Sequence, residues 1–138
     1  ETIKVKRESG ETVVIDLVGI ETPESPGNTN PARFEGVPSS QQGRQLLGQI
    51  HNRALSYTKS QFRQQVVTVA TDPNVRKTDD GHLRAYVYIG GFMYNSQLLR
   101  IGYARVTDSE FSKRPLFREK MQTAQQKGYG VCSANQPR

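Results

Sequence analysis

The chain has 138 residues, a length typical of one domain that buries its own hydrophobic core. No apolar run approaches the roughly 18 residues of a membrane span, so no segment is expected to cross a bilayer. The single cysteine, Cys132, excludes an internal disulfide, and no Cys/His cluster has zinc-ligand spacing. A formal net charge of +6 favours a polyanionic partner such as nucleic acid.

The first part of the chain predicts a β-hairpin followed by a long loop. Two strands, Thr2–Lys6 and Thr12–Ile20, flank a polar turn in which Gly10 can supply the positive φ. The segment Ser25–Ser40 is rich in Pro, Gly and Asn, which predicts irregular structure. Because long loops beside a site are usually functional, this one can cover the site or bring Arg33 or Arg44 into it.

A helix and a strand are predicted next. Ser39 or Ser40 can act as the N-cap of a helix that runs to about Tyr57, with apolar residues at helical spacing. His51 on this helix has no Cys, Asp or His partner at ligand spacing, so it is expected to flank the helix. The β-branched residues at positions 66, 67 and 69 indicate a strand.

The second half predicts strands that alternate with two helices. After a turn over residues 77–81, a strand runs from His82 to Ile89, and two glycines then form a hairpin turn. Asn95 can cap a short helix, Ser96–Ile101, and a strand Tyr103–Val106 follows.

A final helix, about Pro115–Lys127, completes the order, with Pro near its start and Gly128 just past its end. This order suggests an OB-like α+β fold in one domain, residues 1–133, with a loose tail over 134–138.

Two glutamates follow an apolar strand at a Thr-Pro turn, in the segment Glu21-Thr22-Pro23-Glu24. Exposed carboxylates at the end of a strand indicate a cationic partner, either a metal ion or a basic group. Asp16 places a further acid in the middle of the same strand.

Three blocks of the sequence resemble the staphylococcal nuclease-like (thermonuclease) family in their residues, order and spacing: Gly19–Glu24, Gly81–Tyr88 and Asn95–Val106. The resemblance covers about residues 1–133, with Ser25–Ser40 as a divergent insert. It implies a five-stranded OB-like β-barrel with about three α-helices. In active members it implies a calcium-dependent phosphodiesterase that cleaves DNA and RNA.

The resemblance also implies roles for the acidic segment. Glu21 matches a metal-binding acid and Glu24 the catalytic glutamate, while Glu1 lies nearest the position of a second metal acid. Calcium prefers oxygen ligands, which Glu21, Glu1 and the Thr22 carbonyl can supply. Glu24 can orient or deprotonate a water molecule.

Two positions depart from the family pattern, because Asp16 and His82 stand where active members carry arginines that clamp the phosphate. A carboxylate at position 16 repels a phosphate unless a cation neutralises it. Alternatively, Asp16 enlarges the acidic cluster as a further metal ligand. His82 can donate to a phosphate when protonated.

Arg84 can replace a lost arginine, because strand alternation places it on the face of His82, roughly 6 to 7 Å away. The other interpretation of Arg84 is a surface arginine paired with Asp16. The candidate nucleic-acid-binding residues, which combine cations with a stacking ring, are Arg84, Arg76, Lys77, Lys113 and Tyr86.

Two functional hypotheses therefore stand. The first is a nucleic-acid-directed domain that acts as a metal-dependent phosphodiesterase with Ca²⁺, favoured by Glu21, Thr22 and Glu24. The second is a non-catalytic nucleic-acid-binding or protein-interaction module, favoured by Asp16 and His82. In both, we expect a monomer and a single-stranded DNA or RNA partner. Because the chain begins without Met inside a strand-like run, an upstream segment is expected, and a signal for secretion or surface display would lie there.

Overall fold

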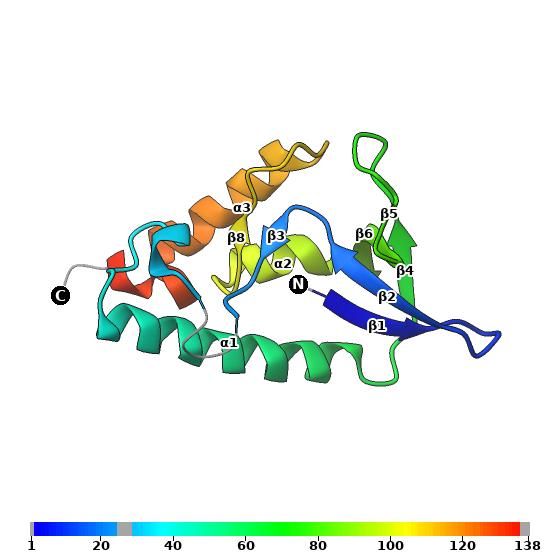
Figure 1. Cartoon of the computed structure of the whole chain (residues 1–138), viewed down its shortest axis with the longest axis horizontal. Helices are drawn as coiled ribbons and strands as arrows, with labels where there is room; N and C mark the ends of the chain where they lie inside the picture. Colours follow the sequence, from blue (N-terminus) through cyan, green and yellow to red (C-terminus); the bar gives the residue numbers. More distant parts are fainter. Residues whose placement is uncertain (1, 25–28, 136–138) are drawn as a thin grey trace.

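A computed structural model describes residues 2–24 and 29–135 of the chain (Figure 1). The strands are β1 Thr2–Lys6, β2 Thr12–Leu17, β3 Ile20–Glu21, β4 Val67–Ala70, β5 Thr78–Asp79, β6 His82–Ile89, β7 Phe92–Met93 and β8 Arg105–Val106. The α-helices are α1 Gln41–Phe62, α2 Tyr94–Arg100 and α3 Arg114–Lys127, and the 3₁₀ helices are η1 Pro31–Arg33 and η2 Gly130–Asn135.

Strand β6 is the centre of the main sheet, whose order is β1-β2-β6-β4, and β5 and β7 also pair with it. Strands β3 and β8 form a separate two-stranded sheet. Helix α1 runs beneath the strands along the length of the molecule, and α3 lies on the opposite side (Figure 1). The predicted α+β fold with three α-helices is confirmed, although the described strands do not close into a barrel. None of the described helices is long and apolar enough to span a membrane.

The predicted strand Thr12–Ile20 ends early, at Leu17, because the chain turns at Val18 and Gly19 before β3 begins at Ile20. Gly19 has a φ of 82°, and a Cβ atom there would lie 2.6 Å from the ring of Phe111. Only glycine combines this backbone conformation with so close an aromatic ring. After the turn, Glu21 pairs with Arg105 of β8 instead of continuing beside β6.

The helix ends show which capping signals were correct. The Ser40 hydroxyl accepts a hydrogen bond from the Gly43 amide at 3.3 Å and begins α1, which extends five residues beyond the predicted end at Tyr57. Gly128 ends α3 in the left-handed conformation with a φ of 69°, as predicted. The predicted cap of α2 is wrong, since Met93 is the N-cap and Asn95 lies inside the helix.

Asn95 instead joins three elements from a fully buried position. Its Nδ2 donates to the carbonyls of Val18 at 3.0 Å and Ala85 at 3.3 Å, and its Oδ1 accepts from the Val87 amide at 3.0 Å. The pairing of β2 with β6 ends at Leu17 and Ala85, and the Ala85 carbonyl also accepts from the Val18 amide at 3.0 Å. The side chain of Asn95 therefore adds a second hydrogen bond to the Ala85 carbonyl and gives partners to the Val18 carbonyl and the Val87 amide at the point where strand pairing ends.

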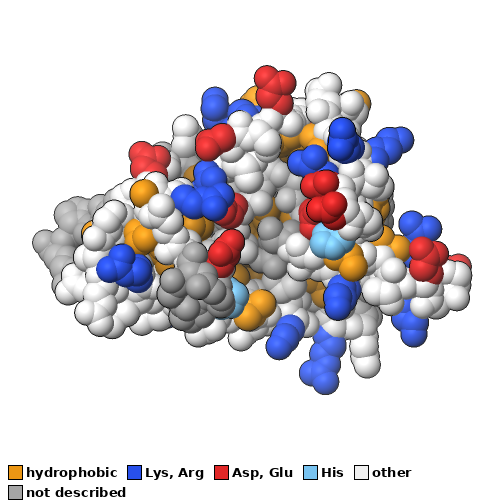
Figure 2. Space-filling model, viewed as in Figure 1, with side chains coloured by type: hydrophobic (Ala, Val, Ile, Leu, Met, Phe, Trp, Pro, Cys, Tyr) orange, Lys and Arg blue, Asp and Glu red, His pale blue; other side chains and the backbone are white. Residues whose placement is uncertain are grey.

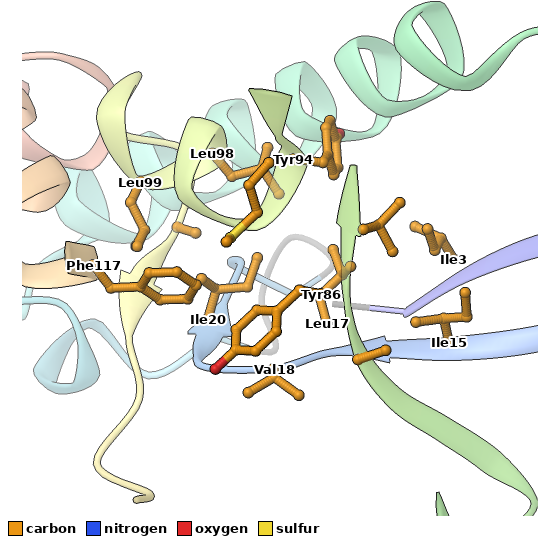
Figure 3. Close-up of a cluster of buried hydrophobic side chains, with 14 of the residues drawn as sticks. Ile3, Ile15, Leu17, Val18, Ile20, Tyr86, Tyr94, Leu98, Leu99 and Phe117 are labelled. Carbon is orange, nitrogen blue, oxygen red and sulfur yellow. The ribbon is translucent and has the colours of Figure 1, made fainter. Parts of the chain in front are cut away.

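The hydrophobic core lies between the main sheet and the helices α2 and α3 (Figure 3). Tyr86 of β6 packs edge-on against Phe117 of α3, with ring centroids 5.9 Å apart. On the side of α1, Phe62 packs edge-on against Tyr94 at 4.5 Å. The labelled core residues in Figure 3 are Ile3, Ile15, Leu17, Val18, Ile20, Tyr86, Tyr94, Leu98, Leu99 and Phe117.

Replacing Asn95 with alanine should lower the free energy of unfolding by about 3 kcal/mol, because buried backbone groups lose their partners. The control is Asn52→Ala on the exposed face of α1, where a change within about 0.5 kcal/mol is expected. Urea unfolding followed by circular dichroism measures both. Equal small losses in the two variants would contradict the bridging role.

Candidate functional site

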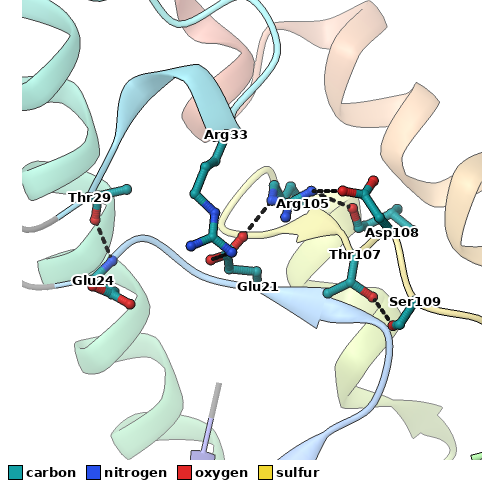
Figure 4. A network of polar contacts seen from close by, with 9 residues as sticks. Glu21, Glu24, Thr29, Arg33, Arg105, Thr107, Asp108 and Ser109 are labelled. Carbon is teal, nitrogen blue, oxygen red and sulfur yellow. Dashed lines mark hydrogen bonds and ion pairs between the residues drawn. The ribbon is translucent and has the colours of Figure 1, made fainter.

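Glu21 is the centre of an ion-pair group with two arginines (Figure 4). Its Oε2 lies 2.7 Å from Nη2 of Arg33, and its Oε1 accepts a hydrogen bond from Nε of Arg105 at 2.5 Å. Arg105 reaches it through the β3–β8 pairing, and Arg33 reaches it from η1. Both carboxylate oxygens of Glu21 therefore face guanidinium groups.

The loop before α1 thus contributes Arg33 to the site, one of the two arginines that the sequence singled out there. Asn30 caps η1, since its Oδ1 accepts from the Ala32 amide at 3.0 Å. The other arginine, Arg44, is exposed near the start of α1, and its side chain forms no ion pair with the residues that the structure describes. Residues 25–28 of the predicted loop lie outside the described residues.

Glu24 is exposed and lies apart from the ion-pair group, beside α1 (Figure 4). Its backbone amide donates to the Thr29 hydroxyl at 2.6 Å. Glu24 lines a hollow of about 280 Å³ together with Glu21, Thr22, Pro23, His51, Ala54 and Leu55. The structure therefore keeps the acidic segment in one pocket, although only Glu21 is neutralised by cations.

His51 is a residue of this pocket that the sequence did not assign to it. Its Nδ1 lies 2.9 Å from the Pro23 carbonyl, which only accepts, so Nδ1 carries the proton in this hydrogen bond. The contact joins residues 28 positions apart, and no local spacing in the sequence indicates it. His51 fixes the acidic segment against α1.

Asp16 belongs to a second group, on β1, β2 and β6. Its Oδ1 accepts from the Thr2 hydroxyl at 3.0 Å and lies 3.0 Å from Nδ1 of His82. The pairing of β2 with β6 sets Asp16 opposite Arg84, yet the carboxylate of Asp16 contacts Thr2 and His82. His82 therefore binds the carboxylate at position 16.

Arg84 is half-buried, and among the described residues its side chain forms no hydrogen bond or ion pair. It lines a hollow of about 390 Å³ whose other polar side chains are Thr2, Asp16, Asp79, Thr107 and Ser109. A guanidinium that is partly desolvated and unpaired attracts an anion more strongly than one in bulk water.

The described side chains do not fit a calcium ion. Within residues 2–24 and 29–135, no three His, Cys, Asp or Glu side chains are grouped so that they can hold a metal. Arg33 and Arg105 place two positive charges on Glu21, the acid that matches a metal ligand. Glu1, the other expected acid, lies outside the described residues.

Tyr86 lies in the core and is only 1% exposed, so no open face of its ring is available for stacking with a base. Its hydroxyl donates to Asp72, which also accepts from the Ser112 amide at 2.7 Å and the Asn74 amide at 2.8 Å. Burial raises the pKa of Asp72, but the hydrogen bonds from Tyr86, Asn74 and Ser112 outweigh it and lower the pKa to about 2. The ammonium of Lys113 lies 5.6 Å from the ring centre of Tyr86.

Arg76 and Lys77 are exposed on the segment that leads to β5 and β6. The face shown in Figure 2 mixes acidic and basic side chains, and both histidines are visible on it. Ile20 lines the hollow that contains Asp16 and Arg84, and Glu21 lines the Glu24 pocket, so the two groups meet at β3.

The sequence pattern described as Staphylococcal nuclease homologue matches residues 14–133. The chain therefore belongs to this family, which associates it with nucleases and nucleic-acid-binding domains. The family covers the acidic segment, the Asp16 and His82 group and the helices that support them.

An uncharacterised protein of Methanocaldococcus jannaschii is 28% identical to this chain over 117 residues. The aligned region covers 79% of this chain and 56% of the archaeal protein. The chain thus spans little more than half the length of that relative.

Arg105→Ala should lower the free energy of unfolding by about 2 kcal/mol, because it removes the better buried partner of Glu21. Arg33→Ala should cost less than about 1 kcal/mol, because exposed ion pairs contribute little. The side chain of Arg33 is 51% exposed, against 18% for Arg105. Urea unfolding of both variants tests this order, and a larger loss for Arg33→Ala would contradict it.

Proposed function

We propose that the domain binds single-stranded nucleic acid through the face that carries Arg84 and His82. The observation that carries the proposal is the Arg84 guanidinium, which forms no hydrogen bond or ion pair with the described residues and lines a hollow of about 390 Å³. Membership of the nuclease-related family and a net charge of +6 support a polyanionic ligand.

The surroundings of Arg84 define how a phosphate would be held. Arg84 offers planar, bidentate donors to phosphate oxygens. Asp16 would oppose the phosphate, but its contact with His82 offsets that charge when the imidazole is protonated. Asp79 lines the same hollow and remains a source of repulsion. We therefore expect moderate affinity that falls steeply with salt.

The shape of the site favours a flexible strand over a duplex. The two hollows have volumes of about 280 and 390 Å³, and they are adjacent because Glu21 lines the first and Ile20 the second. The second volume lies at the lower end of the range for small-ligand pockets, roughly 300 to 1,000 Å³, and the first lies just below that range. Separate nucleotides of a single strand can enter hollows of this kind, whereas a rigid duplex presents its backbone as a continuous surface.

Arg84→Ala should weaken binding to a fluorescent single-stranded DNA and reduce the slope of log K against log salt by about 0.7, the value for one phosphate contact. The matched control is Lys127→Ala at the exposed end of α3, which should leave both quantities unchanged. Fluorescence anisotropy at several salt concentrations measures them. An unchanged slope in Arg84→Ala would sink the assignment of Arg84.

Hydrolysis of the bound strand is the second candidate, and the exposed carboxylate of Glu24 favours it. Glu24 matches the family's catalytic glutamate and shares its pocket with His51. A carboxylate that is open to water can accept a proton from an attacking water molecule. However, the two guanidiniums nearest this segment are already bound to Glu21. Binding without cleavage is therefore the favoured function.

We expect the protein to leave single-stranded DNA and RNA intact, both with added calcium and with a chelator. The assay compares the unaltered chain with Glu24→Gln on denaturing gels, and anisotropy confirms that each preparation binds. Cleavage that the chelator abolishes and that Glu24→Gln loses would establish the hydrolytic candidate and reject a purely binding role.

A further inference from the structure

Two strands of the main sheet have an outer edge without a partner strand among the described residues. Strand β1 pairs only with β2, and β4 pairs only with β6. An edge of this kind presents backbone amides and carbonyls that another extended segment can bind. The hairpin of β1 and β2 projects at the end of the molecule away from α3 (Figure 1).

A hollow of about 810 Å³ lies between the β1–β2 hairpin and β4. Its apolar lining comes from both edges and from the end of α1, and it consists of Val5, Val13, Ile15, Phe62, Val66, Val67, Val69 and Leu83. Val67 and Val69 lie on the same face of β4, because side chains alternate along a strand. The two unpaired edges therefore border one apolar hollow.

The edge of β4 lacks the features that normally protect an open strand. Residues 66–70 read Val-Val-Thr-Val-Ala, with no charge and no proline, and Val66 is 92% exposed. Proteins usually guard open edges with lysines, prolines or bulges, since apolar edges promote aggregation. An unguarded edge beside an apolar hollow indicates that a further segment covers it.

The other border of the hollow is basic. Lys4, Lys6 and Arg7 line it on the side of β1, with Glu8 as the acid. This charge favours a segment with acidic residues and disfavours β1 of a second copy, which carries the same lysines.

We propose that an extended peptide segment in which apolar residues alternate with acidic ones binds as an additional strand between β1 and β4. Its apolar side chains enter the hollow, and its acidic side chains face Lys4 and Lys6. Strand β1 has five residues, so five or six residues of the segment, about 17 to 20 Å in length, match its edge. This surface is separate from the face that carries Arg84.

The probe is an end-capped eight-residue peptide in which valine alternates with glutamate, labelled with a fluorophore. Its controls are a peptide in which valine alternates with lysine and a peptide with four valines followed by four glutamates. We expect only the alternating glutamate peptide to bind. On binding, backbone amides of β1 and β4 should gain protection in hydrogen exchange.

Charge reversal in Lys4→Glu with Lys6→Glu should weaken binding of the glutamate peptide roughly tenfold and create binding of the lysine peptide. Both lysines are exposed, so this variant should fold. The matched control, Arg44→Glu with Lys127→Glu, carries the same charge change elsewhere on the surface and should keep the original preference.

Three outcomes would overturn the proposal. The first is no binding of the alternating glutamate peptide at millimolar concentration. The second is binding that does not protect the amides of β1 and β4. The third is a dimer in sedimentation analysis whose interface protects β4, which would assign the hollow to a second copy.

Discussion

The buried amide of Asn95 is the contact on which the arrangement of sheet, helix and site depends. It binds backbone groups of Val18, Ala85 and Val87 where β2 and β6 stop pairing, so it holds α2 against both strands. Without it, the Val18 carbonyl and the Val87 amide would lose a buried hydrogen-bond partner, which is costly in a low dielectric. Because the chain leaves the main sheet at this point, the acidic segment can follow a separate path.

The turn at Gly19 then decides where the acids go. It directs the chain into β3, whose pairing with β8 brings Arg105 to Glu21, while Asp16 stays in the main sheet beside His82. The acidic residues therefore form two groups instead of one cluster. In each group the carboxylate already has a cationic or titratable partner, so the attraction that a metal ion would need is partly satisfied within the protein.

This distribution of charge connects the family to the proposed activity. The described chain keeps the family's acidic segment, but Arg33 and Arg105 are bound to Glu21. Positions 16 and 82, where active members carry arginines, hold a carboxylate and an imidazole. Arg84 lines a hollow on β6, and among the described residues its side chain forms no ion pair. Such a site can bind a single nucleic-acid strand. Stabilising the charge of a phosphoryl transition state requires several converging donors, which the described residues of this site do not combine.

Local signals in the sequence determined the elements of the fold: the Ser40 cap, the glycine that ends α3 and the bounds of β6, His82–Ile89, all correspond to the structure. These features depend on neighbours within a few residues, which sequence spacing records directly. The tertiary structure decided the partners of each site residue. Arg105 and His51 reach the acidic segment from 84 and 28 positions away, and Tyr86 is buried because α3 covers it. Such contacts depend on how distant elements pack, and no local pattern of residues encodes that packing.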